Sequence, residues 1–366
     1  MTPTRLFHVF STFAVGGPQT RTVQMMNRWG AEFSHTVFAM DGRYDARKLI
    51  APTTPVAFGE SNERGLAYVR GVINRVRAEK PGVVLTYNWG AIEVALGTRL
   101  FGGRPVVHLE DGFGADEAAG LKTRRVLARR AILGGIHATL VPSRTLFDIA
   151  LHQYKLPPAK VRFIPNGIDV DKFRNEPDLT WRQSLGISPE TLLFGFVGLL
   201  RPEKNLEFLI RAYAAADLPG SKLVLVGSGG CREELERLTA ELNLGDRVLF
   251  AGHAAEPHRC LAAFDVFVMS SSTEQMPMAL LEAMACGLPA VCTAVGDTGE
   301  LLGSAEPPAV IPKTDAAGYA QALRTIAADP ELRRRLGAAN RARCLERYTL
   351  ERMANEHASL YREAAG

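Results

Sequence analysis

Short apolar runs alternate along this chain with longer amphipathic stretches. The first run, at 5–10, is followed by two glycines and by a helical pattern at about 19–29, and the same unit then repeats. Strands that are apolar throughout and alternate with helices are typical of a parallel sheet covered on both faces. The pattern therefore predicts a doubly wound α/β fold.

The alternation stops once, in a turn-rich segment at 165–177, and then begins again. The expected strands lie at 5–10, 35–40, 83–87, 105–109, 138–142 and 161–165 before this segment, and at 192–197, 222–226, 247–250, 266–269, 290–293 and 309–311 after it. We therefore predict two Rossmann-like domains, at 1–171 and 172–349. The pattern leaves open whether the last helical stretch, at about 350–366, packs on the first domain.

Ligands of open α/β sheets bind at the carboxyl ends of the strands, so the cleft between two such domains is the expected site. The segment 271–289 follows a predicted strand, and Pro277 and Gly287 suit the start and the end of a helix. Glu274 then lies before this helix and Glu282 inside it. Helix amides would face an anion, and two carboxylates suit a ligand rich in hydroxyls. By spacing alone, a buried helix with glutamates at its ends is the more common arrangement.

The same segment closely resembles the E-x7-E signature of glycosyltransferase family 4, retaining enzymes of the GT-B fold that use nucleotide-sugar donors. The resemblance extends to further segments, namely Gly16-Gly17, 161–169, 201–205, 225–229 and 294–302. It implies that 172–349 binds the donor, that 1–171 binds the acceptor, and that the helix at 350–366 crosses back to 1–171. It also implies that Glu274 contacts the donor sugar and that Glu282 contacts the ribose hydroxyls.

Two cations, Arg201 and Lys204, follow a predicted strand and could neutralise a departing nucleoside diphosphate without a metal ion. The family usually reads G-R-L-x-P-E-K here, and Lys204 matches that pattern. Leu199 takes the place of the usual arginine, however, so Arg201 is our proposed substitute. The remaining donor-binding candidates are Gly16, Gly17, Gly227, Gly229, Gln275, Met276, Pro277 and Met278. The glycines around 227 do not match the dinucleotide fingerprint, which disfavours a nicotinamide dehydrogenase.

A second departure concerns a histidine that the family often carries in a context like P-V-V-x-x-E-H-G. This chain has Asp111 in its place. An aspartate could accept a hydrogen bond from a sugar hydroxyl, but as an anion it would repel the donor phosphates. We keep Asp111 as a catalytic-site candidate, and we expect His108 to be a core histidine of a strand.

The net charge of +4 hides an asymmetry, because residues 1–171 carry +8 and residues 172–366 carry −4. Much of the excess lies in a helical stretch at 120–133 that contains no acid. Its cations are Lys122, Arg124, Arg125, Arg129 and Arg130. A solvated surface helix explains them, and so does an interfacial helix on anionic lipid or beside an anionic acceptor. We do not expect nucleic-acid binding, since neither a known motif nor an aromatic platform accompanies the charge.

Five cysteines at irregular spacing fit reduced thiols in a cytosol. The apolar stretch at 6–10 is too short for a signal peptide, and Glu282, Gly287 and Pro289 divide the long apolar run at 276–295. We therefore expect a cytoplasmic protein without a transmembrane segment, with peripheral membrane association as an option.

These observations together predict a retaining glycosyltransferase that needs neither a metal ion nor a cofactor. It would move a sugar from a UDP-, GDP- or ADP-sugar to the hydroxyl of a sugar, glycolipid or lipid-linked acceptor in glycoconjugate biosynthesis. Two alternatives remain at this point: a non-catalytic sugar-nucleotide-binding or scaffolding relic of the fold, and a GT-B sugar-nucleotide epimerase.

Overall fold

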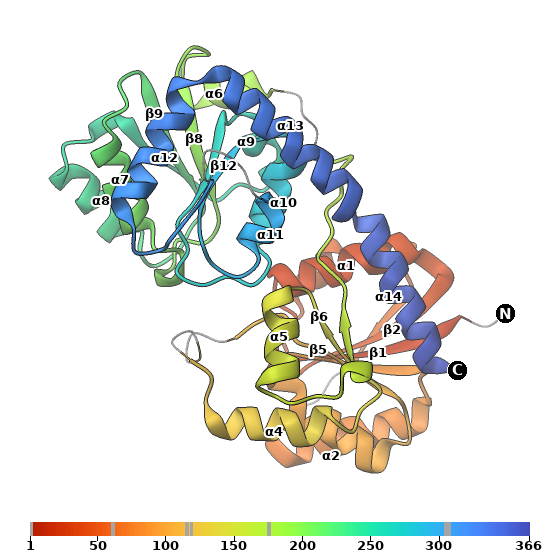
Figure 1. The fold of residues 1–366 in the computed structure, drawn as a ribbon. Helices are drawn as coiled ribbons and strands as arrows, with labels where there is room; N and C mark the ends of the chain where they lie inside the picture. The colour runs from red at the N-terminus through yellow and green to blue at the C-terminus, as the bar shows by residue number, and fades with distance from the viewer. Residues whose placement is uncertain (1–2, 60–62, 114–116, 118–119, 174–176, 304–308) are drawn as a thin grey trace. The chain divides into compact units, whose positions relative to one another are not determined.

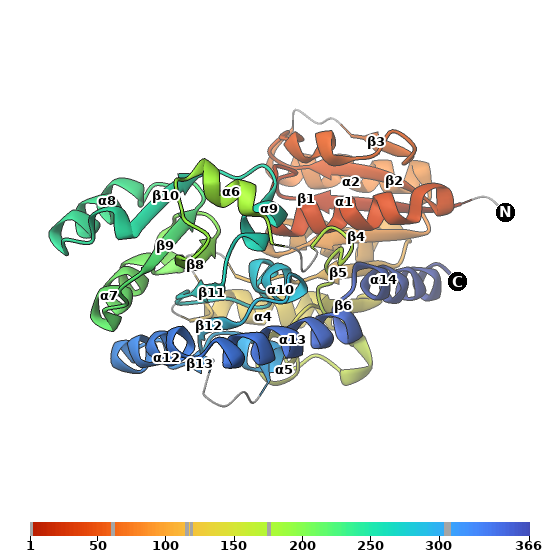
Figure 2. The same ribbon diagram turned by 90° about the horizontal axis from the view of Figure 1, so that it is seen from above.

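A computed structural model describes residues 3–59, 63–113, 117, 120–173, 177–303 and 309–366. The chain forms two compact units (Figures 1 and 2). Unit 1 contains residues 1–166 and 350–366, and unit 2 contains residues 167–349. The chain thus leaves unit 1 a few residues before the boundary that the turn-rich segment suggested.

Unit 1 contains a seven-stranded parallel sheet with the strand order β3-β2-β1-β4-β5-β6-β7. Its strands are β1 (Thr4–Phe10), β2 (Phe33–Ala39), β3 (Val56–Phe58), β4 (Val83–Tyr87), β5 (Val106–Leu109), β6 (Ala138–Val141) and β7 (Val161–Phe163). Its α-helices are α1 (Gly17–Trp29), α2 (Gly65–Glu79), α3 (Ile92–Gly97), α4 (Thr123–Leu133), α5 (Arg144–His152) and α14 (Leu350–Ala365). Its short helical turns are η1 (Gly30–Glu32), η2 (Asp45–Leu49), η3 (Trp89–Ala91), η4 (Thr98–Gly102) and η6 (Pro158–Lys160).

Alternate side chains of each strand in this sheet enter opposite cores. Leu6 and Phe10 of β1 pack with α1 and α14, whereas Phe7 and Val9 pack with α2, α3, α4 and α5. Since both faces are covered, the strands are mostly apolar, as the sequence pattern indicated. The sequence missed only β3 in this sheet, a three-residue edge strand that is too short to produce a recognisable apolar run.

Unit 2 contains a six-stranded parallel sheet with the strand order β10-β9-β8-β11-β12-β13. Its strands are β8 (Leu192–Val197), β9 (Ser221–Val226), β10 (Val248–Gly252), β11 (Val266–Met269), β12 (Ala290–Thr293) and β13 (Val310–Ile311). Its helices are α6 (Leu179–Ser184), α7 (Leu206–Ala216), α8 (Arg232–Glu241), α9 (Pro257–Ala262), α10 (Met278–Ala285), α11 (Thr298–Leu302), α12 (Ala316–Ala328) and α13 (Pro330–Arg347), with short turns η7 (Pro202–Lys204) and η8 (Gly245–Arg247). Two Rossmann-like units with parallel sheets confirm the predicted fold class.

The C-terminal helix α14 belongs to unit 1, although α13 immediately before it belongs to unit 2. It packs against α1 and the strands β4 and β5. The Trp29 indole Nε1 donates a hydrogen bond to the carbonyl of Ala354 at 3.2 Å, and Tyr361 is buried in the same core. The return of this helix to the N-terminal unit, which the family resemblance implied, is therefore confirmed.

The five cysteines are free thiols, four of them buried and Cys231 partly exposed. Among the described helices, none combines the length and the apolar composition needed to cross a bilayer.

A buried histidine pair lies in the core of unit 1. His8 Nδ1 is 2.9 Å from the Tyr87 hydroxyl, and His8 Nε2 is 3.0 Å from His35 Nδ1. Burial lowers the pKa of His8 well below its usual value, with a smaller contribution from His35. Burial also lowers the pKa of His35 to about 4. Both rings are therefore neutral in the folded protein near pH 7.

This pair predicts that unit 1 is sensitive to acid. The unfolded chain binds a proton at each histidine near pH 6.5, whereas the folded chain does not, so stability is lost as the pH falls below 6.5. For one histidine the free energy of unfolding at pH 5.5 should be about 1.4 kcal/mol lower than at pH 8. Urea titrations across this range should show a smaller loss for His35→Asn. A His152→Asn control, which changes an exposed histidine of the same unit, should follow the wild type. Equal pH dependence in all three proteins would contradict the prediction.

Candidate functional site

The strand order of unit 2 reverses between β8 and β11. The chain runs outward from β8 to β9 and β10, and then crosses to β11, β12 and β13 on the other side. At such a switch point the two loops at the carboxyl ends of the strands diverge, leaving room for a ligand. The loops in question are 198–204 after β8 and 270–277 after β11.

An ion pair connects these two loops. Lys204, at the end of η7, places its Nζ 2.5 Å from Glu274 Oε1. The Ser271 hydroxyl donates a hydrogen bond of 2.8 Å to the same carboxylate oxygen. The side chains of Lys204 and Glu274 are 24% and 15% exposed, so both are largely withdrawn from solvent while remaining accessible to a small molecule. Two of the candidates for a catalytic role, which are Glu274, Arg201, Lys204 and Asp111, are thus brought together.

Three consecutive serines fix the geometry of this pair. Ser270 Oγ donates to the Lys204 carbonyl at 2.9 Å, and both the main-chain N–H and the hydroxyl of Ser272 donate to the Glu203 carbonyl, at 2.9 and 3.1 Å. Sequence reasoning did not assign a role to these serines. The available signal was the run of three polar residues directly after a buried strand.

A third loop, after β12, packs against the main chain of Glu274 and Gln275. The Asp297 N–H donates to the Gln275 carbonyl at 2.9 Å. Gly296 has a φ of +49°, and a Cβ at this position would lie only 2.4 Å from the Glu274 carbonyl oxygen. Only a glycine permits this close approach of two main chains. Gly296 and Asp297 therefore belong to the structure that holds Glu274.

The helix that follows Glu274 is α10, and Glu282 lies in its second turn. Pro277 occupies the position just before the helix, so the N–H groups of its first turn begin at Met278. The predicted arrangement, with one glutamate before the helix and one inside it, is observed. Burial raises the pKa of Glu282 to about 7, and the opposing effect of the nearby Lys172 ammonium is smaller. Glu282 is thus poised between its neutral and ionised forms near physiological pH.

The glycines after β9 hold two loops together. The Leu200 N–H donates to the Ser228 carbonyl at 2.9 Å, and the Gly198 N–H donates to the Val226 carbonyl at 3.0 Å. A Cβ on Gly227 would lie 1.8 Å from the Gly198 oxygen, and one on Gly229 would lie 2.3 Å from the Leu200 oxygen. Their visible role is therefore to let this loop pack against the loop that carries Lys204.

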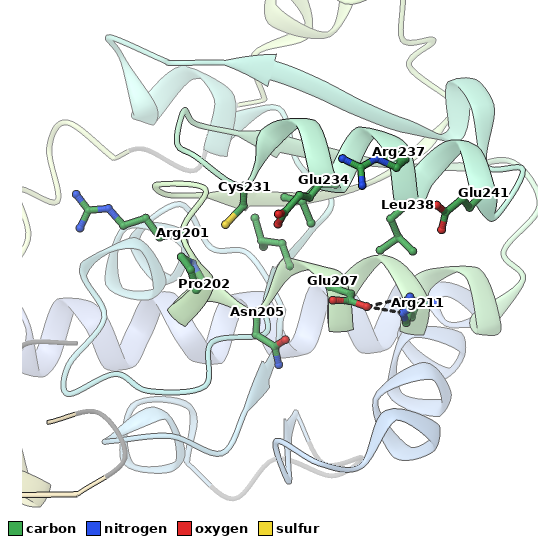
Figure 3. Close-up of a pocket in the computed structure, with 12 residues that line it drawn as sticks. Arg201, Pro202, Asn205, Glu207, Arg211, Cys231, Glu234, Arg237, Leu238 and Glu241 are labelled. Atoms are coloured by element: carbon green, nitrogen blue, oxygen red, sulfur yellow. Dashed lines mark hydrogen bonds and ion pairs between the residues drawn. The ribbon is translucent and has the colours of Figure 1, made fainter. Parts of the chain in front are cut away.

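Arg201 is not drawn into the Lys204–Glu274 pair. Its side chain is 59% exposed, and its nearest acidic partner is Glu203, at 3.9 Å. It lines a cavity of about 430 Å³ between α7 and α8, together with Cys231 and Glu234. Figure 3 shows its guanidinium extending away from the Glu207–Arg211 pair at the other side of this cavity. Leu199, in the place of the usual arginine, is 44% exposed.

The unit 1 candidates lie at the carboxyl ends of strands in their own sheet. Gly16 immediately precedes α1, Gly17 begins it, and neither has a positive φ. Asp111 follows β5 and pairs with Arg21 of α1, whose Nη1 is 2.6 Å from Asp111 Oδ1. His108 of β5 is fully buried and its Nδ1 is 2.9 Å from the Thr86 hydroxyl, which confirms it as a core histidine.

Helix α4 carries four of the five predicted cations, Lys122 lies just before it, and not all five face the solvent, which corrects the picture of one basic face. Arg129 is fully buried, and its Nε and Nη2 donate to the Glu110 carboxylate at 2.9 and 3.2 Å. Its guanidinium also lies over the ring of Trp89. Arg125 pairs with Glu117 at 2.9 Å. An acid outside the helix therefore binds each of these arginines, which a local charge count could not detect. Arg124 and Arg130 remain exposed, and Lys122 is partly exposed.

Within the described part of the chain, no group of three or more His, Cys, Asp or Glu side chains is arranged to hold a metal ion.

Comparisons with known proteins cover both units. The model "Glycosyltransferase Family 4" matches residues 15–172, and the model "Glycosyl transferases group 1" matches residues 178–343. A D-inositol 3-phosphate glycosyltransferase of Saccharomonospora viridis is 26% identical over 336 residues, which is 86% of this chain and 78% of that protein. A UDP-Gal:alpha-D-GlcNAc-diphosphoundecaprenol alpha-1,3-galactosyltransferase of Escherichia coli is 35% identical over 152 residues, 39% of each chain.

Solved structures share the fold. Anabaena Alr3699/HepE, solved in complex with UDP and glucose, superposes with a TM-score of 0.84 at 19% identity, covering 97% of this chain and 98% of that one. The two family models account for most of both units, and the chain is thereby identified as a member of this glycosyltransferase family with the GT-B fold.

Proposed function

We propose that this protein is a retaining, metal-independent glycosyltransferase that transfers a sugar from a nucleoside-diphosphate sugar to an acceptor hydroxyl. The observation that carries the proposal is the Lys204–Glu274 ion pair at the switch point of unit 2, in a chain of this family. The pair supplies one cation and one strong hydrogen-bond acceptor side by side, which are the two groups that a sugar diphosphate requires.

The cation and the carboxylate would act on different parts of the donor. The Lys204 ammonium would stabilise the negative charge that develops on the departing diphosphate, the role that a metal ion plays in other transferases. The Glu274 carboxylate would accept hydrogen bonds from hydroxyls of the transferred sugar. Ser271, which already donates to Glu274, would keep the carboxylate in place when Lys204 turns toward the phosphates.

The donor nucleotide would lie along the start of α10. Main-chain groups of Gln275, Met276, Pro277 and Met278 surround the free amides of the first helical turn, which attract phosphate oxygens. Glu282 would accept hydrogen bonds from the ribose hydroxyls. The UDP and glucose present in the Anabaena structure are consistent with this class of ligand. Retention would follow from attack on the face that the diphosphate leaves, with a phosphate oxygen taking the acceptor proton, so that no protein nucleophile is needed.

A catalytically inactive sugar-nucleotide-binding relic is the second candidate function. The observation that favours it is the exposed Leu199 in place of the usual arginine, together with Arg201, which lines the cavity between α7 and α8 and does not pair with Glu274. A relic would bind nucleoside diphosphates but neither hydrolyse nor transfer the sugar.

Removing either member of the ion pair should separate binding from turnover. Lys204→Met leaves the Glu274 carboxylate facing the diphosphate, so nucleoside-diphosphate affinity should fall about 10- to 100-fold. Glu274→Gln frees the Lys204 cation, so affinity should be unchanged or tighter while sugar transfer and slow donor hydrolysis fall about 100-fold or more. Isothermal titration and product assays with UDP-, GDP- and ADP-sugars measure both quantities. Glu203→Gln, an adjacent change outside the pair, is the control. Full turnover in Glu274→Gln would refute the site.

The raised pKa of Glu282 predicts a pH-dependent donor affinity. If the ribose binds the carboxylate form, the competent fraction falls as the pH drops below about 7, and the donor affinity at pH 6 should be about tenfold lower than at pH 8. The intact nucleotide-sugar is the ligand to use, because its diphosphate does not titrate in this range. Glu282→Gln should bind more weakly at pH 8 but with little pH dependence. An identical pH profile in wild type and variant would argue against ribose contact by Glu282.

We also propose that unit 1 meets an anionic membrane carrying a lipid-linked acceptor. Three of the exposed large apolar side chains of unit 1 lie on η4 and α4, namely Leu100, Phe101 and Leu127, and each is more than half exposed. Arg99 connects the two elements by donating to the Ala131 carbonyl at 2.9 Å. Arg124 and Arg130 lie on the exposed side of α4 beside Leu127. Exposed apolar side chains surrounded by cations suit the boundary between lipid headgroups and acyl chains.

Flotation with vesicles containing anionic lipid tests this surface. Leu100→Ser with Phe101→Ser, and separately Arg124→Glu with Arg130→Glu, should each lower the bound fraction several-fold, because each removes one of the two attractions. Leu66→Ser is the matched control, since Leu66 is also an exposed apolar residue of unit 1, at 84%, but lies in the first turn of α2. Zwitterionic vesicles should bind less wild-type protein. Unchanged flotation in both double variants would contradict the proposal.

A further inference from the structure

Asp111 is held in place from the main chain outward. It follows β5 at the carboxyl edge of the unit 1 sheet, where its N–H donates to Asn88 Oδ1 at 2.7 Å. Asn88 follows the adjacent strand β4 and has a φ of +55°, which is uncommon for a residue other than glycine. The order of this sheet reverses between β1 and β4. Asp111 therefore lies one strand away from the switch point of unit 1, where a ligand of this unit is expected.

The partner of Asp111 is a buried arginine from α1. Arg21 Nη1 donates to Asp111 Oδ1 at 2.6 Å and to Asn166 Oδ1 at 2.7 Å. The side chains of Arg21 and Asp111 are only 5% and 9% exposed. Burial lowers the pKa of Arg21, but the charge and the hydrogen bond of Asp111 outweigh burial and raise it. The guanidinium is thus a permanent cation beside Asp111.

This pair is not fully satisfied. Asp111 Oδ2 and Arg21 Nε are both buried, and neither has a hydrogen-bond partner among the described residues. A buried pair that only stabilised the fold would be expected to satisfy these atoms, because a buried polar atom without a partner is costly. A free carboxylate oxygen at the carboxyl edge of the sheet is instead what a hydroxyl-bearing substrate needs as an acceptor.

We propose that Arg21 is a positioning residue, which holds Asp111 so that its free oxygen accepts a hydrogen bond from a sugar hydroxyl during transfer. This inference rests on the proposed function. The guanidinium also answers the objection to an aspartate in the histidine's place: it neutralises the carboxylate, so that Asp111 does not repel the donor phosphates. A neutral sugar hydroxyl, rather than an anionic group such as a uronic-acid carboxylate, is the chemistry that this acceptor fits.

A double-mutant cycle separates positioning from stabilisation. Arg21→Met or Asp111→Asn alone strands one buried charged or polar partner, so each should lower the urea midpoint of unfolding and should lower turnover about 30-fold or more. The double variant removes both charges, and its urea midpoint should recover toward the wild type. Its turnover should stay low, since the carboxylate acceptor is gone. Nucleoside-diphosphate affinity, a property of unit 2, should be unchanged in all three variants.

Two further variants act as controls. Arg21→Lys keeps a cation beside Asp111 and should restore part of the turnover that Arg21→Met loses. Arg182→Met with Asp265→Asn removes a pair of unit 2, at 2.7 Å, whose guanidinium is buried and whose carboxylate, just before β11, is partly exposed. This double variant should lower stability without the same loss of turnover per folded molecule.

The outcomes distinguish the two levels of inference. An active wild type whose Arg21→Met/Asp111→Asn double variant regains turnover together with stability would overturn the positioning role alone. A wild type that neither transfers nor hydrolyses any of the UDP-, GDP- and ADP-sugars would overturn the proposed function, and this inference with it.

Discussion

The geometry of the proposed donor site depends on main-chain hydrogen bonds between loops that are far apart in sequence. The loop after β8 is held by the loop after β9 on one side and by Ser270 and Ser272 of the β11 loop on the other. Because parallel strands end at the same edge, these loops meet only when the whole sheet has formed. Lys204 and Glu274 are 70 residues apart in sequence. Once their loops are held together, these two side chains need little further ordering to meet. Backbone hydrogen bonds therefore preorganise the loops, and the loops position the two charged side chains.

Unit 1 uses the opposite strategy, in which buried charges fix a loop. Glu110 and Asp111 are consecutive acids after β5, and each takes an arginine from a different helix: Arg129 from α4 and Arg21 from α1. Buried ion pairs contribute little net stability, but breaking one is costly, so they specify where the loop must lie. The Arg129–Glu110 contact is bidentate, whereas the Arg21–Asp111 contact leaves an oxygen free. The Arg129–Glu110 pair therefore has a structural role, whereas the Arg21–Asp111 pair has an oxygen left for the proposed ligand.

Local sequence patterns were sufficient to predict the fold but only part of the site. Apolar runs predicted every strand except β3, because strands covered on both faces are mostly apolar. The positions of Glu274 and Glu282 around α10 followed from Pro277 and Gly287, which act locally. The partners of these residues could not be predicted, since a salt bridge such as Lys204–Glu274 or Arg21–Asp111 depends on distances between strands. Arg201 illustrates the same limit, because the cavity that it lines is completed by side chains of α7 and α8.

Charge required the largest revision. Five cations without an acid in one helix suggested a continuous basic face, but burial of Arg129 and pairing of Arg125 remove two of them from that face. Each buried pair contributes zero to the net charge, so the excess of +8 in 1–171 must be carried by other residues. Two of those cations, Arg124 and Arg130, are exposed on the same helix as Leu127, and the helix pattern alone did not single out Leu127, Leu100 and Phe101 as exposed. The charge asymmetry therefore persists, and part of it lies on the exposed side of α4, where the proposed membrane surface would combine cations with apolar groups.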